Sequence, residues 1–251
     1  MTGEMRFQSY TTRDLENIAD QINKKYKPER LDEPMRFDPY ALVDALNYSL
    51  TFAYLTPDMS KLGMAACGDS LCYVWPSVPY YPGLLPHKEL YRAGSIVLDK
   101  QFQESGDEQK IRRALFTLVH EITHLLLHSE YYLLPDNEVY SYQQQKMLMS
   151  TKGELVETSY YDYLYTITEK QANYVAGAFI APEQSVKNIY KDWFQEPDSE
   201  YPLTFNFYRK ERVKKMSNLY RMSYTAMGIR LIQLDILDRE FININSISAK
   251  H

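Results

Sequence analysis

The chain has 251 residues, of which 45% are hydrophobic and 24% are charged, and its formal net charge is −5. These values are typical of a globular protein with a buried core, and they exclude collagen-like, coiled-coil and wholly disordered chains. The acidic balance argues against a protein that mainly coats nucleic acid or an anionic membrane. No apolar stretch reaches the roughly 18 residues of a membrane-spanning helix, and the first ten residues hold no apolar signal core, so we expect a cytoplasmic protein without membrane partners.

Tyrosine and cysteine are the residue types whose numbers stand out. The 23 tyrosines crowd at 131–142 and 160–165 but form no motif. The two cysteines, Cys67 and Cys72, are too few for a disulfide framework or a four-cysteine metal site in a chain of this length. We therefore expect both to be buried thiols.

The first hundred residues are expected to combine two helices with a small sheet. Thr11 lies three residues before Asp14 in a capping-box pattern, and the apolar residues that follow at helical spacing predict a helix over residues 12–25. Asp38 followed by Pro39 marks the start of a second, shorter helix. Between residues 48 and 98, β-rich runs are broken by prolines, which predicts strands at Ser49–Leu55, Ser70–Trp75 and Ser95–Leu98.

Helices dominate the rest of the predicted structure. The clearest runs over 107–128, and a long Tyr-rich connection separates it from a helix at 168–180 that Pro182 ends. After a linker at 195–203, helices are expected at 204–220 and 223–234. Helices before and after a small mixed or antiparallel sheet, without βαβ alternation, predict an α+β fold. We place a domain boundary between residues 1–195 and a helical C-terminal segment at 196–251, which could be helix-turn-helix-like.

Three of the five histidines fall within nine residues. His120, Glu121 and His124 form the pattern H-E-x-x-H on the predicted helix 107–128. Residues four apart lie on one helix face, so His120 and His124 can bind one metal ion together. Glu121 flanks the pair in the position of the general base of a metallopeptidase. The pattern therefore predicts one zinc ion per chain, with Glu121 as the catalytic residue.

The surroundings of this motif support a metal site. The helix is otherwise strongly apolar, as expected of a buried element. Its polar residues recur at three- and four-residue intervals and form one stripe: Thr117, His120, Glu121, His124 and His128. Burying a carboxylate and imidazoles costs several kcal/mol unless they are paired or coordinated, and a metal supplies that compensation. The alternative is a hydrogen-bonded core network without a metal.

Two histidines leave a zinc site incomplete, so a third ligand is required. His128 lies about 12 Å from His120 along the helix axis, too far for a compact site, and we expect it to cap the helix C-terminus. The metzincin pattern is excluded because Leu127 and Glu130 stand where a glycine and a third histidine belong. The remaining candidate for the third ligand is a carboxylate further along the chain.

The candidate carboxylates are Glu154, Glu157 and Glu169, and Glu169 fits best. On its predicted helix it shares a face with Ala172, Asn173 and Ala176. The two alanines would let this helix approach the histidine helix, while Asn173 could hydrogen-bond a metal ligand as a second-shell residue. The alternative interpretation of Glu169 is a surface residue on an amphipathic helix.

The residues around the motif resemble a known family. The run 113–119 leading into HEITH and LLLH, followed by EKQANYVAGAFIAP at 169–182, resembles the ImmA/IrrE family of zinc metallopeptidases. The N-terminal helices, the strand before the histidine helix and the segment 220–237 are also similar to the family pattern, so the resemblance covers most of the chain. By position it implies zinc ligands at His120, His124 and Glu169, a catalytic base at Glu121, and a zincin-like fold.

The resemblance also implies a function. Members of this family are intracellular endopeptidases that cut regulatory proteins, typically helix-turn-helix repressors of mobile elements or stress responses. The connection between His124 and Glu169 is longer here than is usual and is rich in tyrosine. We expect the segment 131–165 to border the substrate cleft, because tyrosines provide a large, fairly rigid contact surface with a polar tip.

The C-terminal segment allows other functions. A predicted helix there carries five basic residues and precedes a second helix that Ser223 caps: Arg209, Lys210, Arg212, Lys214 and Lys215. This unit could contact DNA as a helix-turn-helix, or the basic residues could form a solvated face. The rival functions are therefore a DNA-binding regulator with a non-proteolytic zinc domain and a metallohydrolase for small amides. Glu121 favours proteolysis, because a purely structural zinc site would not need it.

Overall fold

The computed structural model describes residues 9–34, 38–76, 85–104, 106–131, 158–193 and 202–238. It confirms the α+β class. The chain forms two compact units, one from the described residues between 38 and 174, the other from those between 11 and 34 and from 175 onward. The expected boundary at residue 195 differs from this division, which falls inside helix α5 (Thr158–Ile180). None of the described helices combines the length and apolar character needed to cross a membrane.

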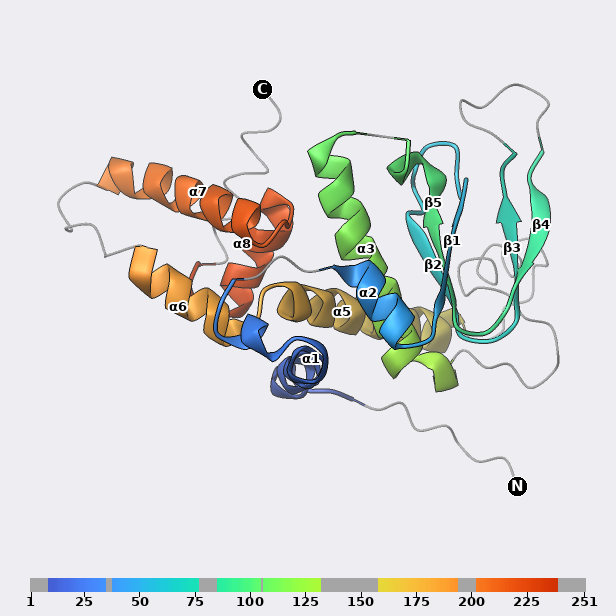
Figure 1. Cartoon of the computed structure of the whole chain (residues 1–251), viewed down its shortest axis with the longest axis horizontal. Helices are drawn as coiled ribbons and strands as arrows, with labels where there is room; N and C mark the ends of the chain where they lie inside the picture. The colour runs from blue at the N-terminus through green and yellow to red at the C-terminus, as the bar shows by residue number, and fades with distance from the viewer. Residues whose placement is uncertain are drawn as a thin grey trace. The chain divides into compact units, whose positions relative to one another are not determined.

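The first unit is built around the buried strand β5 (Ser95–Asp99). It pairs in parallel with β1 (Ser49–Ala53) and antiparallel with β2 (Gly63–Ala66), giving the order β1-β5-β2. Helix α3 (Glu108–Leu127) lies beside this sheet, and the antiparallel pair β3 (Ser70–Val74) and β4 (His87–Tyr91) lies beyond it (Figure 1). All five residues of β5 are buried, which explains its continuous apolar run.

The core of this unit lies on both faces of the three-stranded sheet. Val97 packs with Met64 of β2 and with Cys72 and Val74 of the β3–β4 pair. Side chains alternate along a strand, so Ile96 and Leu98 point to the opposite face, and both are fully buried. Helix α3 packs against β2 and β5, and this packing fixes the histidine helix beside the sheet.

Two helices of this unit begin where the sequence predicts. Helix α2 (Pro39–Ala45) starts at Asp38, whose side chain accepts a hydrogen bond from the Tyr40 amide. Helix α3 starts at Asp107, whose side chain accepts one from the Gln109 amide. Both caps satisfy amides that have no partner inside their own helix, so these starts are encoded locally.

The two sheets each contain one strand that the sequence patterns did not predict. The predicted strands correspond to β1, β3 and β5, whereas β2 and β4 were missed. Strand β2 consists of glycine, methionine and alanines, and four of the five residues of β4 are exposed. Neither has the β-branched or alternating pattern of a strand, and both are held by pairing with a neighbour.

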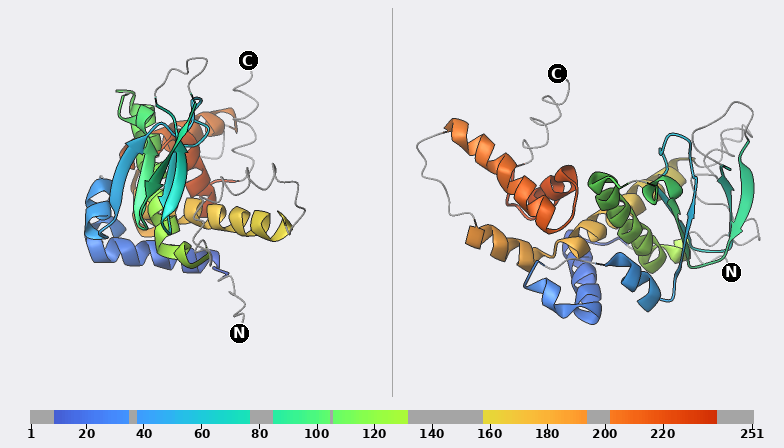
Figure 2. Two further views of the ribbon diagram at one scale, coloured as in Figure 1. Left: turned by 90° about the vertical axis from the view of Figure 1, so that its right-hand side faces the viewer. Right: turned by 45° about the horizontal axis from the view of Figure 1, so that its top comes forward.

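The second unit is helical. It contains α1 (Thr12–Tyr26), η1 (Pro28–Leu31), α6 (Glu183–Trp193), α7 (Pro202–Leu219) and α8 (Tyr224–Gln233). The capping box of Thr11 and Asp14 is present at the start of α1, and Ser223 caps α8, as predicted. The right panel of Figure 2 shows α7 leading into α8 through a short turn. Helix α5 begins at Thr158 rather than near residue 168. The sequence does not predict this early start, because the first part of the helix is rich in tyrosine and threonine, which have low helix propensity.

A buried ion pair joins α8 to α1 within the second unit. Arg230 and Glu16 are both buried and make two hydrogen bonds, with Nη2 donating to Oε2 over 3.0 Å. The Nε–H of Arg230 donates to the carbonyl of Ala181, just after the end of α5, over 2.9 Å. The guanidinium is therefore bonded on both of its edges, as a buried charge requires.

A second buried arginine, Arg30, binds the same helix end. Its guanidinium donates to the carbonyl of Ile180 and to the side chain of Asn23, each over 2.8 Å. Asn23 in turn donates to the carbonyl of Phe179 over 3.0 Å. These carbonyls belong to the last turn of α5, where helix oxygens have no intrahelical partner. The end of α5 thus belongs with α1 and α8, which explains why the division between the units falls before residue 195.

We expect Arg230→Met to lower the free energy of unfolding by about 3–5 kcal/mol, because it leaves the Glu16 carboxylate buried without its partner. The matched control is Arg13→Met, which removes the exposed partner of Glu183 and should cost less than about 1 kcal/mol. Urea denaturation at pH 7 measures both. Equal effects of the two changes would contradict this account. Adding Glu16→Met to Arg230→Met should recover most of the loss.

Candidate metal centre

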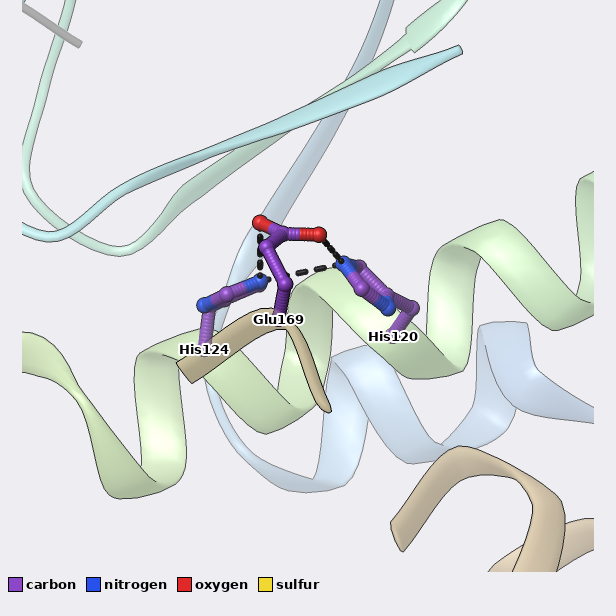
Figure 3. Close-up of side chains that lie close together, drawn as sticks. All are labelled: His120, His124 and Glu169. Atoms are coloured by element: carbon purple, nitrogen blue, oxygen red, sulfur yellow. Dashed lines mark hydrogen bonds and ion pairs between the residues drawn. The ribbon is translucent and has the colours of Figure 1, made fainter. Parts of the chain in front are cut away.

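The structure brings together the three residues predicted to hold a metal. His120 and His124 lie on α3 and Glu169 on α5, and Figure 3 shows their side chains gathered around one point. The two Nε2 atoms are 3.0 Å apart. The carboxylate of Glu169 spans them, with Oε2 3.3 Å from Nε2 of His120 and Oε1 3.3 Å from Nε2 of His124.

These distances fit a metal ion. In a tetrahedral site with bonds of about 2.0–2.2 Å, neighbouring ligand atoms are about 3.3–3.6 Å apart. The two Nε2 atoms are 3.0 Å apart, and each lies 3.3 Å from a different oxygen of Glu169, which is close to that size. His120, His124 and Glu169 therefore form a cluster that could hold a metal ion.

The proton positions on His120 also fit. Its Nδ1 lies 3.1 Å from Oδ1 of Asn173, so Asn173 contacts a metal ligand as the sequence predicted. An amide oxygen only accepts hydrogen bonds, so Nδ1 carries the proton of the neutral ring. The Nε2 atom is then left with a lone pair that points at the common centre, where it meets the carboxylate of Glu169.

The charges around the centre favour a cation there. Burial acts to raise the pKa of Glu169, but its bonds to His120 and His124 outweigh burial and hold that pKa well below its usual range. Burial acts to lower the pKa of His120, but the bond to Glu169 and the charge of Glu121 outweigh it and raise the pKa. A carboxylate that stays ionised beside imidazole lone pairs is a ligand set for a positive ion.

Glu121 has a different environment from Glu169. It is buried at the contact between α3 and β2, with only 8% of its surface exposed. Burial raises its pKa, and the nearby imidazoles of His120 and His124 oppose that rise. Glu121 is not among the three described residues that could hold a metal ion, and its role as a catalytic base stays a prediction.

Gly63 of β2 makes room for Glu121, and the sequence analysis did not single it out. A Cβ atom at this glycine would lie 2.7 Å from Oε1 of Glu121, 2.9 Å from its Cγ and 2.7 Å from Cγ2 of Thr117. All three distances are too short for real atoms, so only glycine lets α3 approach β2 this closely. In the sequence, the signal for this feature is a glycine at the start of a short apolar run. That signal does not reveal which helix packs against the glycine.

The expected role of His128 needs correction. His128 is the C-cap residue of α3, but its ring is fully buried. It is therefore not the charged cap that we expected from the sequence. Its Nδ1 lies 3.0 Å from Nδ1 of His124, and its Nε2 lies 3.0 Å from Oε1 of Gln171. Burial lowers the pKa of His128 to about 3, which keeps the ring neutral. The spacing of four residues between His124 and His128 is the sequence signal for this contact. From the sequence we considered His128 only as a direct metal ligand or a helix cap and therefore missed it.

Other predicted features are placed in part. Glu154, Glu157 and residues 132–157 of the Tyr-rich connection lie outside the described residues. Cys72 is buried as expected, but Cys67 is only half-buried, and burial raises the pKa of its thiol to about 12. Of the basic cluster on α7, Arg209 pairs with Asp238 and Arg212 donates to the hydroxyl of Tyr190, while Lys214 and Lys215 are exposed.

Comparison of the sequence with protein-family models and with curated proteins finds no match. The functional case therefore depends on the chemistry of the His120, His124 and Glu169 cluster and of its neighbours Glu121, Asn173 and His128. Two imidazoles and a carboxylate at metal-ligand distances, with a separate buried carboxylate beside them, are the features that a function must explain.

We expect Glu169→Ala to lower the affinity for Zn²⁺ by more than about a hundredfold. Loss of a residue that only hydrogen-bonds a metal ligand typically lowers the affinity about 10- to 100-fold, and loss of a ligand itself should cost more. Competition with a chromophoric chelator measures the affinity. The control is Glu130→Ala, which removes an exposed carboxylate close to the end of α3 and should leave binding unchanged. Full affinity in Glu169→Ala would exclude Glu169 as a ligand.

We expect Gly63→Ala to lower the free energy of unfolding by about 1–3 kcal/mol, because the new methyl group forces Glu121 and Thr117 to move. Gly177→Ala is the matched control, since its Cβ would meet its nearest neighbours at an ordinary 3.9 Å and alanine favours the helix. That change should be neutral or stabilising by up to about 1 kcal/mol. Urea denaturation compares the two, and a neutral Gly63→Ala would contradict the close approach.

Proposed function

We propose that this protein is a zinc-dependent endopeptidase of the zincin type, similar to the ImmA/IrrE family, that hydrolyses peptide bonds in a regulatory protein of the cytoplasm. The observation that carries the proposal is the separation of two carboxylates. Glu169 joins the histidine nitrogens, whereas Glu121 lies buried beside them and outside the ligand set. A structural zinc site uses four protein ligands, and three ligands with a nearby base are the set of a catalytic one.

Zinc is the metal that this ligand set favours. Imidazole nitrogens and a single carboxylate suit a borderline ion, whereas calcium and magnesium prefer oxygen ligands alone. His120, His124 and Glu169 would hold one ion per chain. When bound, zinc would polarise a peptide carbonyl and make a water molecule more acidic.

Glu121 would accept the proton in this reaction. Burial raises the pKa of its carboxyl group, which makes the carboxylate a stronger base than an exposed one. Gly63 and Thr117 fix its side chain from the strand and from the preceding turn of α3. His120 and His124 stay oriented by Asn173 and His128, so the base and the ligands keep their separate positions.

The proposed substrate is a helix-turn-helix repressor. The Tyr-rich segment 131–165 would border the cleft and grip a protein segment with tyrosine side chains. A peptide must be extended to be cut, so a folded repressor should be cleaved in a linker or a locally unfolded helix. Site-specific cleavage of one regulator and slow turnover of unfolded proteins would follow.

A DNA-binding regulator is the second candidate. Helices α7 and α8 are joined by a short turn, and Lys214 and Lys215 are exposed on α7. In this alternative the zinc domain would sense a signal or act as a scaffold, and it would not cleave a protein. Arg209 and Arg212 of the same cluster make contacts within the chain, which leaves fewer basic residues to bind phosphates.

We expect Glu121→Gln to keep wild-type zinc affinity and to lower the rate of cleavage by about 10²- to 10⁴-fold, because the amide keeps the shape and cannot accept the proton. The assay incubates the zinc-loaded protein with helix-turn-helix repressors, starting with any that a neighbouring gene encodes, and follows the fragments by mass spectrometry. Glu130→Gln is the control and should cleave normally.

Four results would count against the proposal. Loss of zinc from Glu121→Gln would make Glu121 a ligand, and wild-type cleavage by that variant would refute its role as base. Efficient digestion of casein without preference would refute the substrate class. Sequence-specific DNA binding that survives zinc removal, with no proteolysis, would favour the regulator.

A further inference from the structure

We propose that His128 and Gln171 form a buried relay that fixes the tautomer of His124 and thereby presents the Nε2 lone pair of His124 to the metal. The relay consists of two hydrogen bonds in series, from His124 to His128 and from His128 to Gln171, each 3.0 Å long. This inference rests on the proposed metal site but does not depend on peptide hydrolysis.

The direction of the relay follows from its last member. Oε1 of Gln171 can only accept a hydrogen bond, so Nε2 of His128 carries a proton. A neutral imidazole has one proton, so Nδ1 of His128 accepts, and Nδ1 of His124 must donate to it. With its proton on Nδ1, His124 keeps a lone pair on Nε2, the atom that faces His120 and Glu169.

The opposite arrangement would disable the site. If Nδ1 of His128 donated, Nδ1 of His124 would have to accept, and the proton of a neutral His124 would move to Nε2. That proton would point into the cluster and occupy the direction of the metal bond. The relay therefore excludes the one tautomer of His124 that cannot bind an ion.

Burial makes this relay different from an ordinary bond to solvent. His128 has no exposed surface and Gln171 is 4% exposed, so water cannot replace either partner without opening the core. By contrast, Asn173, which orients His120, is exposed. Gln171 is also two residues from Glu169, so the helix that supplies the third ligand also supplies the residue that orients the second. His128 and Gln171 are positioning residues, since they act on the metal through His124.

The alternative is that His128 only fills space in the core. The two roles are separated by His128→Phe, which fills most of the volume but cannot accept a hydrogen bond, and by His128→Gln, which offers an acceptor oxygen at the same helix position. A packing role predicts that phenylalanine is tolerated at least as well as glutamine. The relay predicts the reverse order in zinc affinity.

Competition with a chromophoric chelator measures Zn²⁺ affinity in the full chain. We expect His128→Phe to lower the affinity by about 10- to 100-fold, and His128→Gln to stay within about threefold of the wild type. The control is Leu126→Phe, a change at an exposed position of the same turn, which should have no effect. Wild-type zinc affinity in His128→Phe would overturn the relay, whatever the peptidase activity.

Imidazole ¹⁵N chemical shifts of the metal-free wild-type protein at pH 7 test the relay without any variant. We expect His128 to be protonated on Nε2 alone and His124 to carry a proton on Nδ1. A proton on Nδ1 of His128 would overturn the relay even if zinc binds normally. The expected protonation pattern together with tight zinc binding and no cleavage of any protein would support the relay and refute the peptidase.

Discussion

Three electron-pair donors converge on one point in the first unit, and the surrounding helices and strands must hold them there. Nε2 of His120, Nε2 of His124 and the carboxylate of Glu169 lie within 3.0–3.3 Å of one another. Donors packed this closely repel one another unless a proton or a metal ion lies among them. The apolar helix α3 and the fully buried strand β5 supply a rigid support for this arrangement, and the relay and Asn173 keep both rings turned inward.

The two units solve the problem of buried charge in different ways. In the second unit, Arg230 and Glu16 neutralise each other, and the carbonyl of Ala181 accepts the remaining donor. Such a pair is complete and has no capacity for a further ion. In the first unit, two carboxyl groups and two imidazoles gather, and the charge of Lys61 also acts on Glu121. The excess of acceptors distinguishes a binding site from a structural ion pair.

The features that could be predicted from the sequence are those that local chemistry encodes. Side-chain caps fix the starts of α1, α2, α3 and α8, and the four-residue spacing places His120 and His124 on one face. Glu169 was identified because Ala172 and Asn173 share its face. Features that depend on a distant partner were missed: strands β2 and β4, the clearance at Gly63, and the bond from His128 to Gln171. The early start of α5 was also missed, since tyrosines and threonines give a weak helical signal.

The environments of the two glutamates assign their roles more firmly than the motif does. Contacts with His120 and His124 outweigh burial and hold the pKa of Glu169 low, so it stays ionised beside the two imidazoles. Burial against β2 raises the pKa of Glu121, and Gly63 leaves its carboxylate just enough room. Two carboxyl groups whose pKa values are driven apart by their surroundings are suited to separate tasks. In the proposed reaction the low-pKa group would be the metal ligand, and the high-pKa group would take up and release the proton. Because Glu121 follows His120 directly on α3, the proposed base and the proposed ligand are positioned by one helix.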